Sequence, residues 1–137
     1  MCLSHLGAML SGMRFTTKVL YGVRIMIDIA QQEGERTPLR YTAKRQEISA
    51  KYSEPIVSEL RHAGLIKSRR GVHGGYLLGR PADEISLGDI LRVVDDLYVA
   101  SEDPQDKAID KAFKRVRAAA WDTLDAVSLA KAAKTQR

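Results

Sequence analysis

One stretch of the chain, residues 49–79, constrains the fold more than any other. Its first half carries apolar residues at helical spacing, namely Tyr52, Ile56, Val57 and Leu60, and it ends at Gly64, since glycine is common just past a last helical turn. Two short apolar runs, 65–68 and 76–78, then flank the glycine-rich turn 69–75, which predicts a β-hairpin. A polar-faced helix followed by a hairpin with an arginine-rich tip is typical of a winged helix-turn-helix. In that arrangement the helix enters the DNA major groove and the tip reaches the flanking DNA.

The distribution of charge supports this interpretation. The net charge is +5, and residues 1–80 carry 13 Lys and Arg against 6 Asp and Glu, whereas residues 81–137 carry 9 against 11. The basic charge therefore lies in the half that contains the helix and the hairpin, as expected of a surface that faces polyphosphate. The alternative for charge taken alone is a basic face that is merely solvated.

Candidate DNA contacts come from three places: the start of the first helix, the polar face of the predicted recognition helix, and the hairpin tip. We expect Arg14, Lys18, Arg69 and Arg70 to bind phosphate or a narrow minor groove, and Lys51, Glu54 and Ser58 to read bases. His73 is either a DNA contact or an exposed loop histidine. The complete predicted set is Arg14, Thr17, Lys18, Ser49, Lys51, Tyr52, Ser53, Glu54, Ser58, Arg69, Arg70, His73, Gly74 and Gly75.

The recognition helix has an irregular start. If Ser49 is the N-cap, Pro55 lies inside the helix, where proline removes a hydrogen bond and clashes with the carbonyl of Lys51. We therefore expect Ser53 to be the N-cap, with Pro55 in the first turn and residues 50–52 in a separate turn or a kinked start.

Two helices precede the predicted recognition helix. A first helix is predicted from Thr16 or Thr17 to about Gln32, and a second from Leu39 to Gln46 after Pro38. The turn at residues 46–49 contains no glycine, although such turns often need a positive φ. We expect this turn to be wound differently from the usual one.

After Pro81, the run Ser86-Leu87-Gly88-Asp89 predicts a capping box, followed by a helix that buries Ile90, Leu91, Val93 and Val94. An acidic loop follows, and Asp103-Pro104 predicts the start of a long helix. The apolar residues of that helix repeat every three or four positions, a seam of the kind that helices use to pair: Ile109, Phe113, Val116, Ala120 and Leu124. Ser128 is expected to cap a last short helix, and residues 131–137 are expected to fray.

Several of these residues carry a resemblance to a known family. They are residues 13–18 (MRFTTK), the run Leu60-Arg61 with Ala63-Gly64-Leu65, residues 74–79 (GGYLLG), and Gly88-Asp89-Ile90. Over residues 13–96 the chain resembles the Rrf-type bacterial winged-helix transcription regulators of the IscR, NsrR and CymR type. The resemblance implies a mainly α fold with a small β-hairpin wing, divided into an N-terminal extension (1–12), a DNA-binding domain (13–96), and a loop with a dimerisation helix (97–137).

In the cluster-binding members of this family, the loop before the long helix carries three cysteines, and here it carries none. Cys2 is the only cysteine, and a protein-held iron–sulfur cluster usually takes four ligands, mostly thiolates. We therefore expect no cofactor, as in cluster-free members such as CymR. The signal is left open between a small molecule, a protein partner and oxidation of Cys2.

No arrangement of nucleophile and base and no phosphate-binding glycine motif occurs, so we do not expect an enzyme. No apolar run approaches a membrane span of about 18 residues, residues 1–12 do not resemble a signal peptide, and one cysteine fits a reducing cytoplasm. We predict a homodimeric, sequence-specific transcription regulator, a repressor, that binds a pseudo-palindromic site on double-stranded DNA. The alternative is a winged-helix interaction module that binds a metabolic enzyme.

Overall fold

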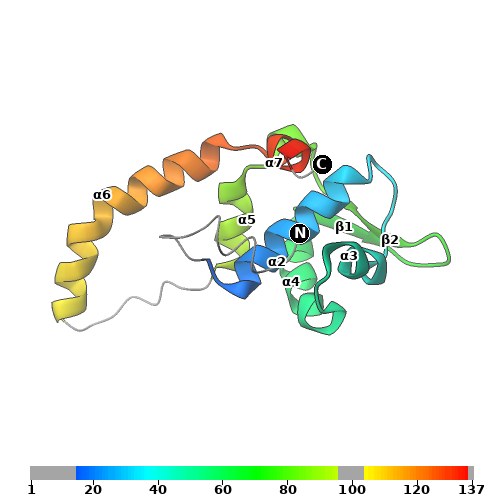
Figure 1. Ribbon diagram of the computed structural model, residues 1–137, viewed down its shortest axis with the longest axis horizontal. Coiled ribbons are helices and arrows are strands. Elements are labelled where there is room, and N and C mark those ends of the chain that lie inside the picture. The colour runs from blue at the N-terminus through cyan, green and yellow to red at the C-terminus, as the bar shows by residue number, and fades with distance from the viewer. Residues whose placement is uncertain (1–14, 96–103, 136–137) are drawn as a thin grey trace.

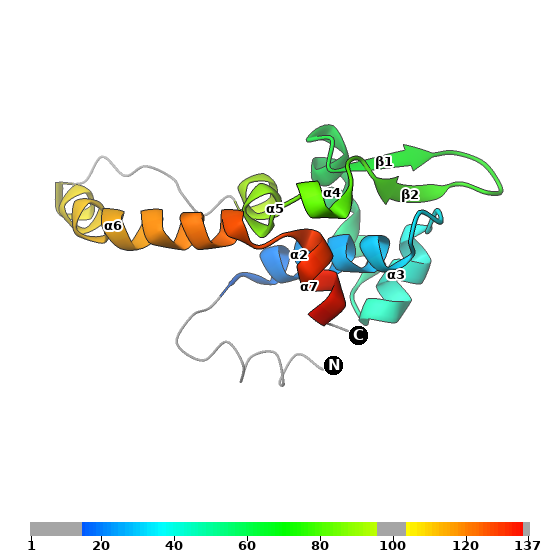
Figure 2. The same ribbon diagram turned by 90° about the horizontal axis from the view of Figure 1, so that it is seen from above.

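The computed structural model describes residues 15–95 and 104–135, and these form a mainly helical fold with one two-stranded hairpin (Figures 1 and 2). The fold class predicted from the sequence, a winged helix-turn-helix with a long C-terminal helix, is confirmed. In chain order the elements are α2 (Thr17–Gln31), α3 (Leu39–Gln46), α4 (Ala50–His62), β1 (Ile66–Arg69), β2 (Gly75–Leu78), the short 3₁₀ helix η1 (Ala82–Glu84), α5 (Leu87–Val94), α6 (Pro104–Ala126) and α7 (Leu129–Thr135).

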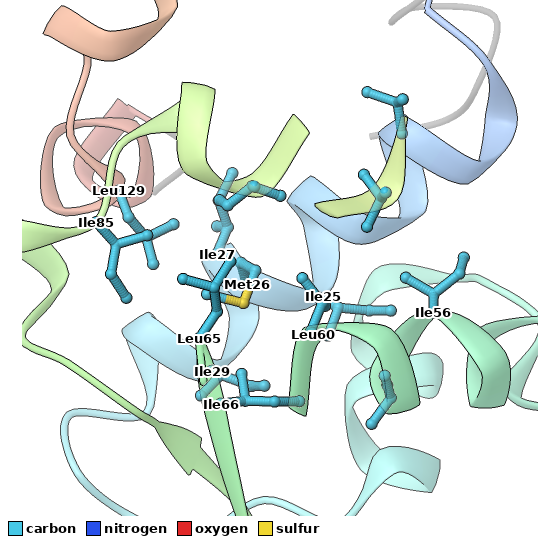
Figure 3. Packing of buried hydrophobic residues seen from close by; sticks show 14 of the residues in the cluster. Ile25, Met26, Ile27, Ile29, Ile56, Leu60, Leu65, Ile66, Ile85 and Leu129 are labelled. Atoms are coloured by element: carbon cyan, nitrogen blue, oxygen red, sulfur yellow. The ribbon is translucent and has the colours of Figure 1, made fainter. Parts of the chain in front are cut away.

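Helix α2 is the centre of the core. Thr16 is its N-cap and its hydroxyl accepts a hydrogen bond from the Val19 amide at 3.2 Å. Helices α3, α4, α5 and α7 and strand β2 all contact α2, so its buried residues extend around most of its circumference. The core is rich in isoleucine and leucine, and Figure 3 shows the packing of these members of it: Ile25, Met26, Ile27, Ile29, Ile56, Leu60, Leu65, Ile66, Ile85 and Leu129.

The expectation that the turn between α3 and α4 is wound differently is wrong, because the turn has the usual positive φ even though it contains no glycine. Glu47 adopts a left-handed conformation with φ 54° and ψ 46°, which is uncommon for a residue with a side chain. Its strain is offset by the next residue, because Ile48 is buried in the core and its amide donates to the carbonyl of Ala43 at 3.0 Å.

The start of α4 differs from the prediction. Ser49, not Ser53, is the N-cap, since the Ser49 hydroxyl accepts from the Tyr52 amide at 3.1 Å, and Pro55 lies inside the helix. The reason is burial: a helix that begins at Ala50 places Ser53 on the core face with Ile56 and Leu60, and Ser53 is 0% exposed. The Ser53 hydroxyl is satisfied there by donating to the Ser49 carbonyl at 2.7 Å.

The wing is the antiparallel hairpin β1–β2, with Ile66 opposite Leu78 and Arg69 opposite Gly75. Gly64 has a φ of +79°, the left-handed conformation expected where α4 ends. Thr37 also pairs with Tyr76 by two backbone hydrogen bonds of 3.1 and 2.9 Å, which join the segment before α3 to β2 near the tip of the wing.

The C-terminal helices form an arm and its attachment. The capping box of α5 is confirmed, with Ser86 and Asp89 each bonded to the other's amide at 2.9 and 3.0 Å. Helix α6 extends away from the body at the end opposite the wing, and α7 returns to pack against α2 (Figures 1 and 2). Ser128 caps α7 as predicted, but the predicted fraying is wrong for residues 131–135, because Ala133 is buried and its carbonyl accepts from Gln31 at 3.0 Å.

Candidate nucleic-acid interface

The outer face of α4 is polar and open to solvent. Lys51, Glu54, Arg61 and His62 are exposed and Ser58 is half-buried, so the predicted base-reading residues share one accessible side of the helix. Tyr52, which lies on the apolar stripe and is also one of the predicted DNA contacts, is 49% exposed, and its ring meets the Tyr21 ring edge to face at a centroid distance of 5.3 Å. Of the predicted contacts on this helix, Ser53 is the exception, because a completely buried side chain is not part of this surface.

An open hollow of about 520 Å³ lies between the start of α2 and the first turns of α4. It brings together four of the predicted residues, Lys18, Ser49, Lys51 and Tyr52, beside the N-terminus of α4. Two cations and a helix N-terminus make this hollow suitable for a phosphate oxygen. Thr17 is exposed one residue before Lys18, and Arg14 lies outside the described residues.

Glu59 also lines this hollow and was not identified from the sequence. Its Oε1 accepts from the Lys18 ammonium at 3.0 Å, and among the described residues its buried Oε2 has no hydrogen-bond partner. The pair directs Lys18 toward the recognition helix. The two residues are 41 positions apart, so no local pattern indicates the contact.

The wing tip presents Arg69, Arg70 and His73, all exposed, at a distance from the hollow along the hairpin. The neighbouring glycines are required by the fold itself. A Cβ on Gly74 would lie 2.3 Å from the Arg69 carbonyl oxygen, and one on Gly75 would lie 2.7 Å from the Thr37 carbonyl carbon. Gly74 and Gly75 belong to the predicted DNA contacts, and in the structure both lie against the chain's own backbone.

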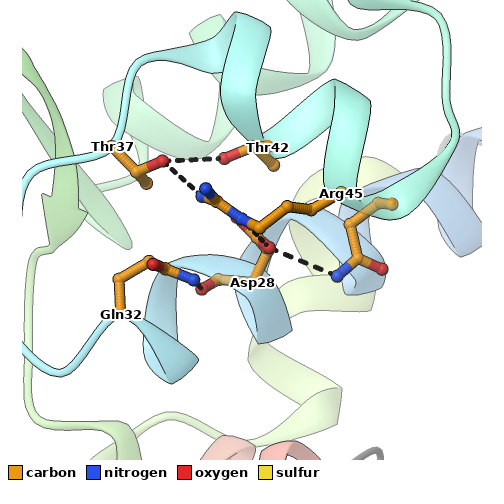
Figure 4. Close-up of polar contacts among 6 residues, drawn as sticks. Asp28, Gln32, Thr37, Thr42 and Arg45 are labelled. Carbon is orange, nitrogen blue, oxygen red and sulfur yellow. Dashed lines mark hydrogen bonds and ion pairs between the residues drawn. The ribbon is translucent and has the colours of Figure 1, made fainter.

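A polar network joins the exposed Arg45 to the buried Asp28, Thr37 and Thr42, and it too was not identified from the sequence (Figure 4). Asp28 of α2 accepts two hydrogen bonds from the Arg45 guanidinium, and these bonds raise the pKa of Arg45 above its ordinary value. The available signal was a single carboxylate within the apolar run 25–29, a pattern that predicts a buried acid with a partner.

The predicted seam of α6 divides into two parts. Ile109, Phe113 and Val116 are 57%, 56% and 63% exposed, and no described residue of α6 is buried. Nearer the body, Leu124 is half-buried and packs with Trp121 against the core, so it already has a partner within the chain.

An ion pair fixes the junction between the arm and the body. Arg92 of α5 lies over the Trp121 ring at 4.6 Å and donates to both carboxylate oxygens of Asp125 at 2.6 and 2.8 Å. These hydrogen bonds lower the pKa of Asp125 and raise that of Arg92.

The side chains that could serve as metal ligands do not fit a cluster held by cysteine thiolates. The sequence contains a single cysteine, and within residues 15–95 and 104–135 no three His, Cys, Asp or Glu side chains are grouped to hold a metal ion. No helix in the same ranges is long and apolar enough to cross a membrane.

Comparison with known proteins agrees with this architecture. A family model described as "Rrf2: Iron-dependent Transcriptional regulator" matches residues 15–135. The HTH-type transcriptional regulator CymR of Bacillus subtilis is 40% identical over 120 residues, which cover 85% of this chain and 87% of CymR. IscR of Serratia proteamaculans is 46% identical over 86 residues, 61% of this chain and 52% of IscR, so the match spans about half of that relative.

Solved structures show the same fold. The structure titled "T. potens IscR" has a TM-score of 0.76 at 36% identity, and the match covers 96% of this chain and 92% of the IscR chain. The structure of B. subtilis CymR has a TM-score of 0.73 at 37% identity, and the match covers 90% of this chain and 98% of the CymR chain. The named relatives are transcriptional regulators and not enzymes, as the sequence predicted. This chain belongs to the Rrf2 family of DNA-binding transcriptional regulators.

Proposed function

We propose that this regulator acts in the cytoplasm as a homodimer that reads a pseudo-palindromic DNA site, and that it does so without an iron–sulfur cluster. The observation that carries the proposal is the outer face of α4. Lys51 and Glu54 are exposed on this face. The wing begins four residues after the helix ends, and Arg69 and Arg70 are exposed on it.

The roles of the side chains follow from their chemistry. Glu54 has two acceptor oxygens and suits the amino group of a cytosine, whereas Lys51 donates to guanine acceptors and Ser58 both donates and accepts. Arg70 suits a narrow minor groove and Arg69 a phosphate. Lys18 beside the N-terminus of α4 supplies affinity without selecting a sequence.

The arm supports dimer formation. Helix α6 projects from the body with Ile109, Phe113 and Val116 exposed along one side, at spacings of four and three residues. Such a stripe on a helix with no buried residue is stabilised when a second copy of the helix packs against it. A two-fold dimer then places two α4 helices on half-sites separated by about 34 Å or a multiple of it.

The single cysteine of the chain supports a cluster-free regulator, and the signal is then a small molecule, a protein or oxidation of Cys2. Iron analysis of protein purified without oxygen is expected to find no stoichiometric iron and no visible absorbance. We infer repression, because the described part of the chain consists of a DNA-binding body and an arm, and occupancy of a promoter is enough to block transcription.

Hydroxyl-radical footprinting on the promoter of the protein's own gene tests the proposal. Two protected half-sites about one helical turn apart, with protection in the flanking minor grooves, are expected. Weak protection that is uniform along the DNA and is lost as salt rises would instead indicate electrostatic attraction alone. That result would favour a winged-helix module whose partner is a protein.

A further inference from the structure

A carboxylate lies at the centre of the molecule, and the DNA-reading role does not use it directly. Asp28 is 1% exposed in the middle of α2, between Ile27 and Ile29. A buried carboxylate destabilises the folded state unless its oxygens are paired. Both oxygens of Asp28 are paired, because Nε of Arg45 donates to Oδ1 at 2.9 Å and Nη2 of Arg45 donates to Oδ2 at 2.8 Å.

Arg45 extends this pair toward the wing. The same Nη2 donates to the hydroxyl of Thr37 at 2.6 Å, and that hydroxyl lies 3.4 Å from the hydroxyl of Thr42 (Figure 4). Thr37 is also the residue whose backbone pairs with Tyr76 of β2 in both directions. One continuous chain of hydrogen bonds therefore runs from the middle of α2, through α3, to the end of β2 that adjoins the tip of the wing.

The wing depends on this attachment for its direction. A two-stranded hairpin is marginal by itself, and within the described residues the sheet contains only β1 and β2. At the attachment the backbones are so close that only glycine fits at position 75, which has a φ of +140°. A bidentate carboxylate–guanidinium pair fixes orientation as well as distance, which an apolar contact does not.

We propose that Asp28, Arg45 and Thr37 are positioning residues for the wing: they fix its angle against α2 and α3, and so they decide whether Arg70 reaches the flanking groove when α4 occupies the major groove. This inference rests on the proposed reading of DNA by α4 and the wing. Asp28 and Thr37 are buried and cannot touch DNA, and Arg45, whose side chain is 40% exposed, holds its guanidinium against Asp28 and Thr37. They act through the backbone of Tyr76 and the hairpin that follows from it.

Thr37→Val tests the proposal with little disturbance, because valine keeps the shape of threonine and leaves the Asp28–Arg45 pair in place. On the promoter DNA we expect affinity to fall about fivefold. Hydroxyl-radical protection is expected to disappear at the flanking minor grooves, whereas protection of guanine N7 from dimethyl sulfate in the major groove is expected to remain. The slope of log affinity against log salt is expected to shrink by about 0.9 for each phosphate that the displaced wing no longer neutralises.

A double-mutant cycle with Arg70→Ala gives the sharpest readout. If Thr37 acts through the wing, Thr37→Val has little further effect once Arg70 is gone, so the two effects are not additive. Arg45→Lys is the second variant; lysine keeps the positive charge but cannot make the two parallel bonds, and the same pattern is expected. Ile85→Val is the matched control, because it disturbs the buried core near α7 and does not alter the network.

The outcomes separate this inference from the proposed function. If the effects of Thr37→Val and Arg70→Ala multiply independently, or if Thr37→Val weakens the flanking and major-groove protection equally, as Ile85→Val would, the positioning role is wrong. If the unaltered protein does not distinguish its promoter from scrambled DNA, the proposed function fails and this inference fails with it. Selective disappearance of flank protection in Thr37→Val, absent in Ile85→Val, supports the role.

Discussion

Arg70 stands exposed near the tip of the wing, and we expect it to enter the groove beside each half-site. Arg70→Ala is expected to weaken binding to the promoter about tenfold and to reduce the salt slope by about 0.9 for each protomer of the dimer. Anisotropy titrations at several salt concentrations measure both quantities. Arg80→Ala is the matched control, since Arg80 is also exposed but pairs with Asp89 at 3.4 Å, and an equal loss of affinity there would mean that only net charge matters.

Glu54 differs from Arg70 in kind, because a carboxylate repels phosphate and binds DNA favourably only through a base amino group. Glu54→Ala is therefore expected to change total affinity little and to lower the ratio of promoter to scrambled-DNA affinity. Competition titrations with the two DNAs give that ratio. A proportionate loss of affinity on both DNAs would contradict the assignment of Glu54 to base reading.

Asp125 makes stability depend on pH in a known direction. Arg92 lowers the folded-state pKa of Asp125 below its ordinary value of 3.8, so charged Asp125 stabilises the folded protein above that value, and the contribution is lost as pH falls through the lowered pKa. Asp125→Asn is expected to lower the melting temperature slightly near pH 7, and the difference from the unaltered protein is expected to shrink below about pH 4. Asp122→Asn is the matched control, because it removes a carboxylate at an exposed position of the same helix and leaves the Arg92–Asp125 pair in place.

At the scale of elements, α4 carries a structural cost within it. Pro55 removes the amide that would bond to the Lys51 carbonyl. Pro55→Ala is expected to stabilise the protein by roughly 1–2 kcal/mol, since proline in a helix interior costs about 3 kcal/mol and the freer unfolded chain recovers part of this. Thermal or urea unfolding measures the change, and a lower stability would mean that Pro55 is not strained in this helix.

Elements with local signals were predicted well. The hairpin follows from its glycines, and the caps at Thr16, Ser86 and Ser128 follow from side chains that accept from amides three residues away. The burial of Ser53 and the exposure of its neighbour Tyr52 were not predictable from hydrophobicity, because the polar residue is the one that is buried. Its small hydroxyl is satisfied by its own helix, which removes the usual penalty for burial.

Elements that depend on distant contacts were predicted less well. Residues 131–135 are helical because Leu129 and Ala133 pack into the core beside α2, about 100 residues earlier in the chain. The same reason explains why Glu59 and Arg45 were missed as members of the candidate site and its support. Each is defined by a partner, Lys18 or Asp28, that only the tertiary fold brings close.

At the scale of the whole molecule, the arm sets the assembly. Phe113→Asp places a charge in the middle of the exposed seam and is expected to convert the dimer to a monomer in sedimentation velocity. Affinity for the two-half-site promoter should then fall about 100-fold, because the second half-site no longer binds intramolecularly. Ala118→Asp adds the same charge to an exposed position away from the seam and is expected to leave the dimer intact. Equal dissociation by both variants would show that charge on α6, and not the seam, controls assembly.

The central claim is that this protein reads DNA sequence through α4 and the wing. Fluorescence anisotropy with the promoter of its own gene, against scrambled DNA of equal length and over a salt series, tests it most directly. We predict tight binding to the promoter that persists at moderate salt, and weak binding to the scrambled DNA that is lost as salt rises. Equal, weak and salt-sensitive binding to both DNAs would contradict it.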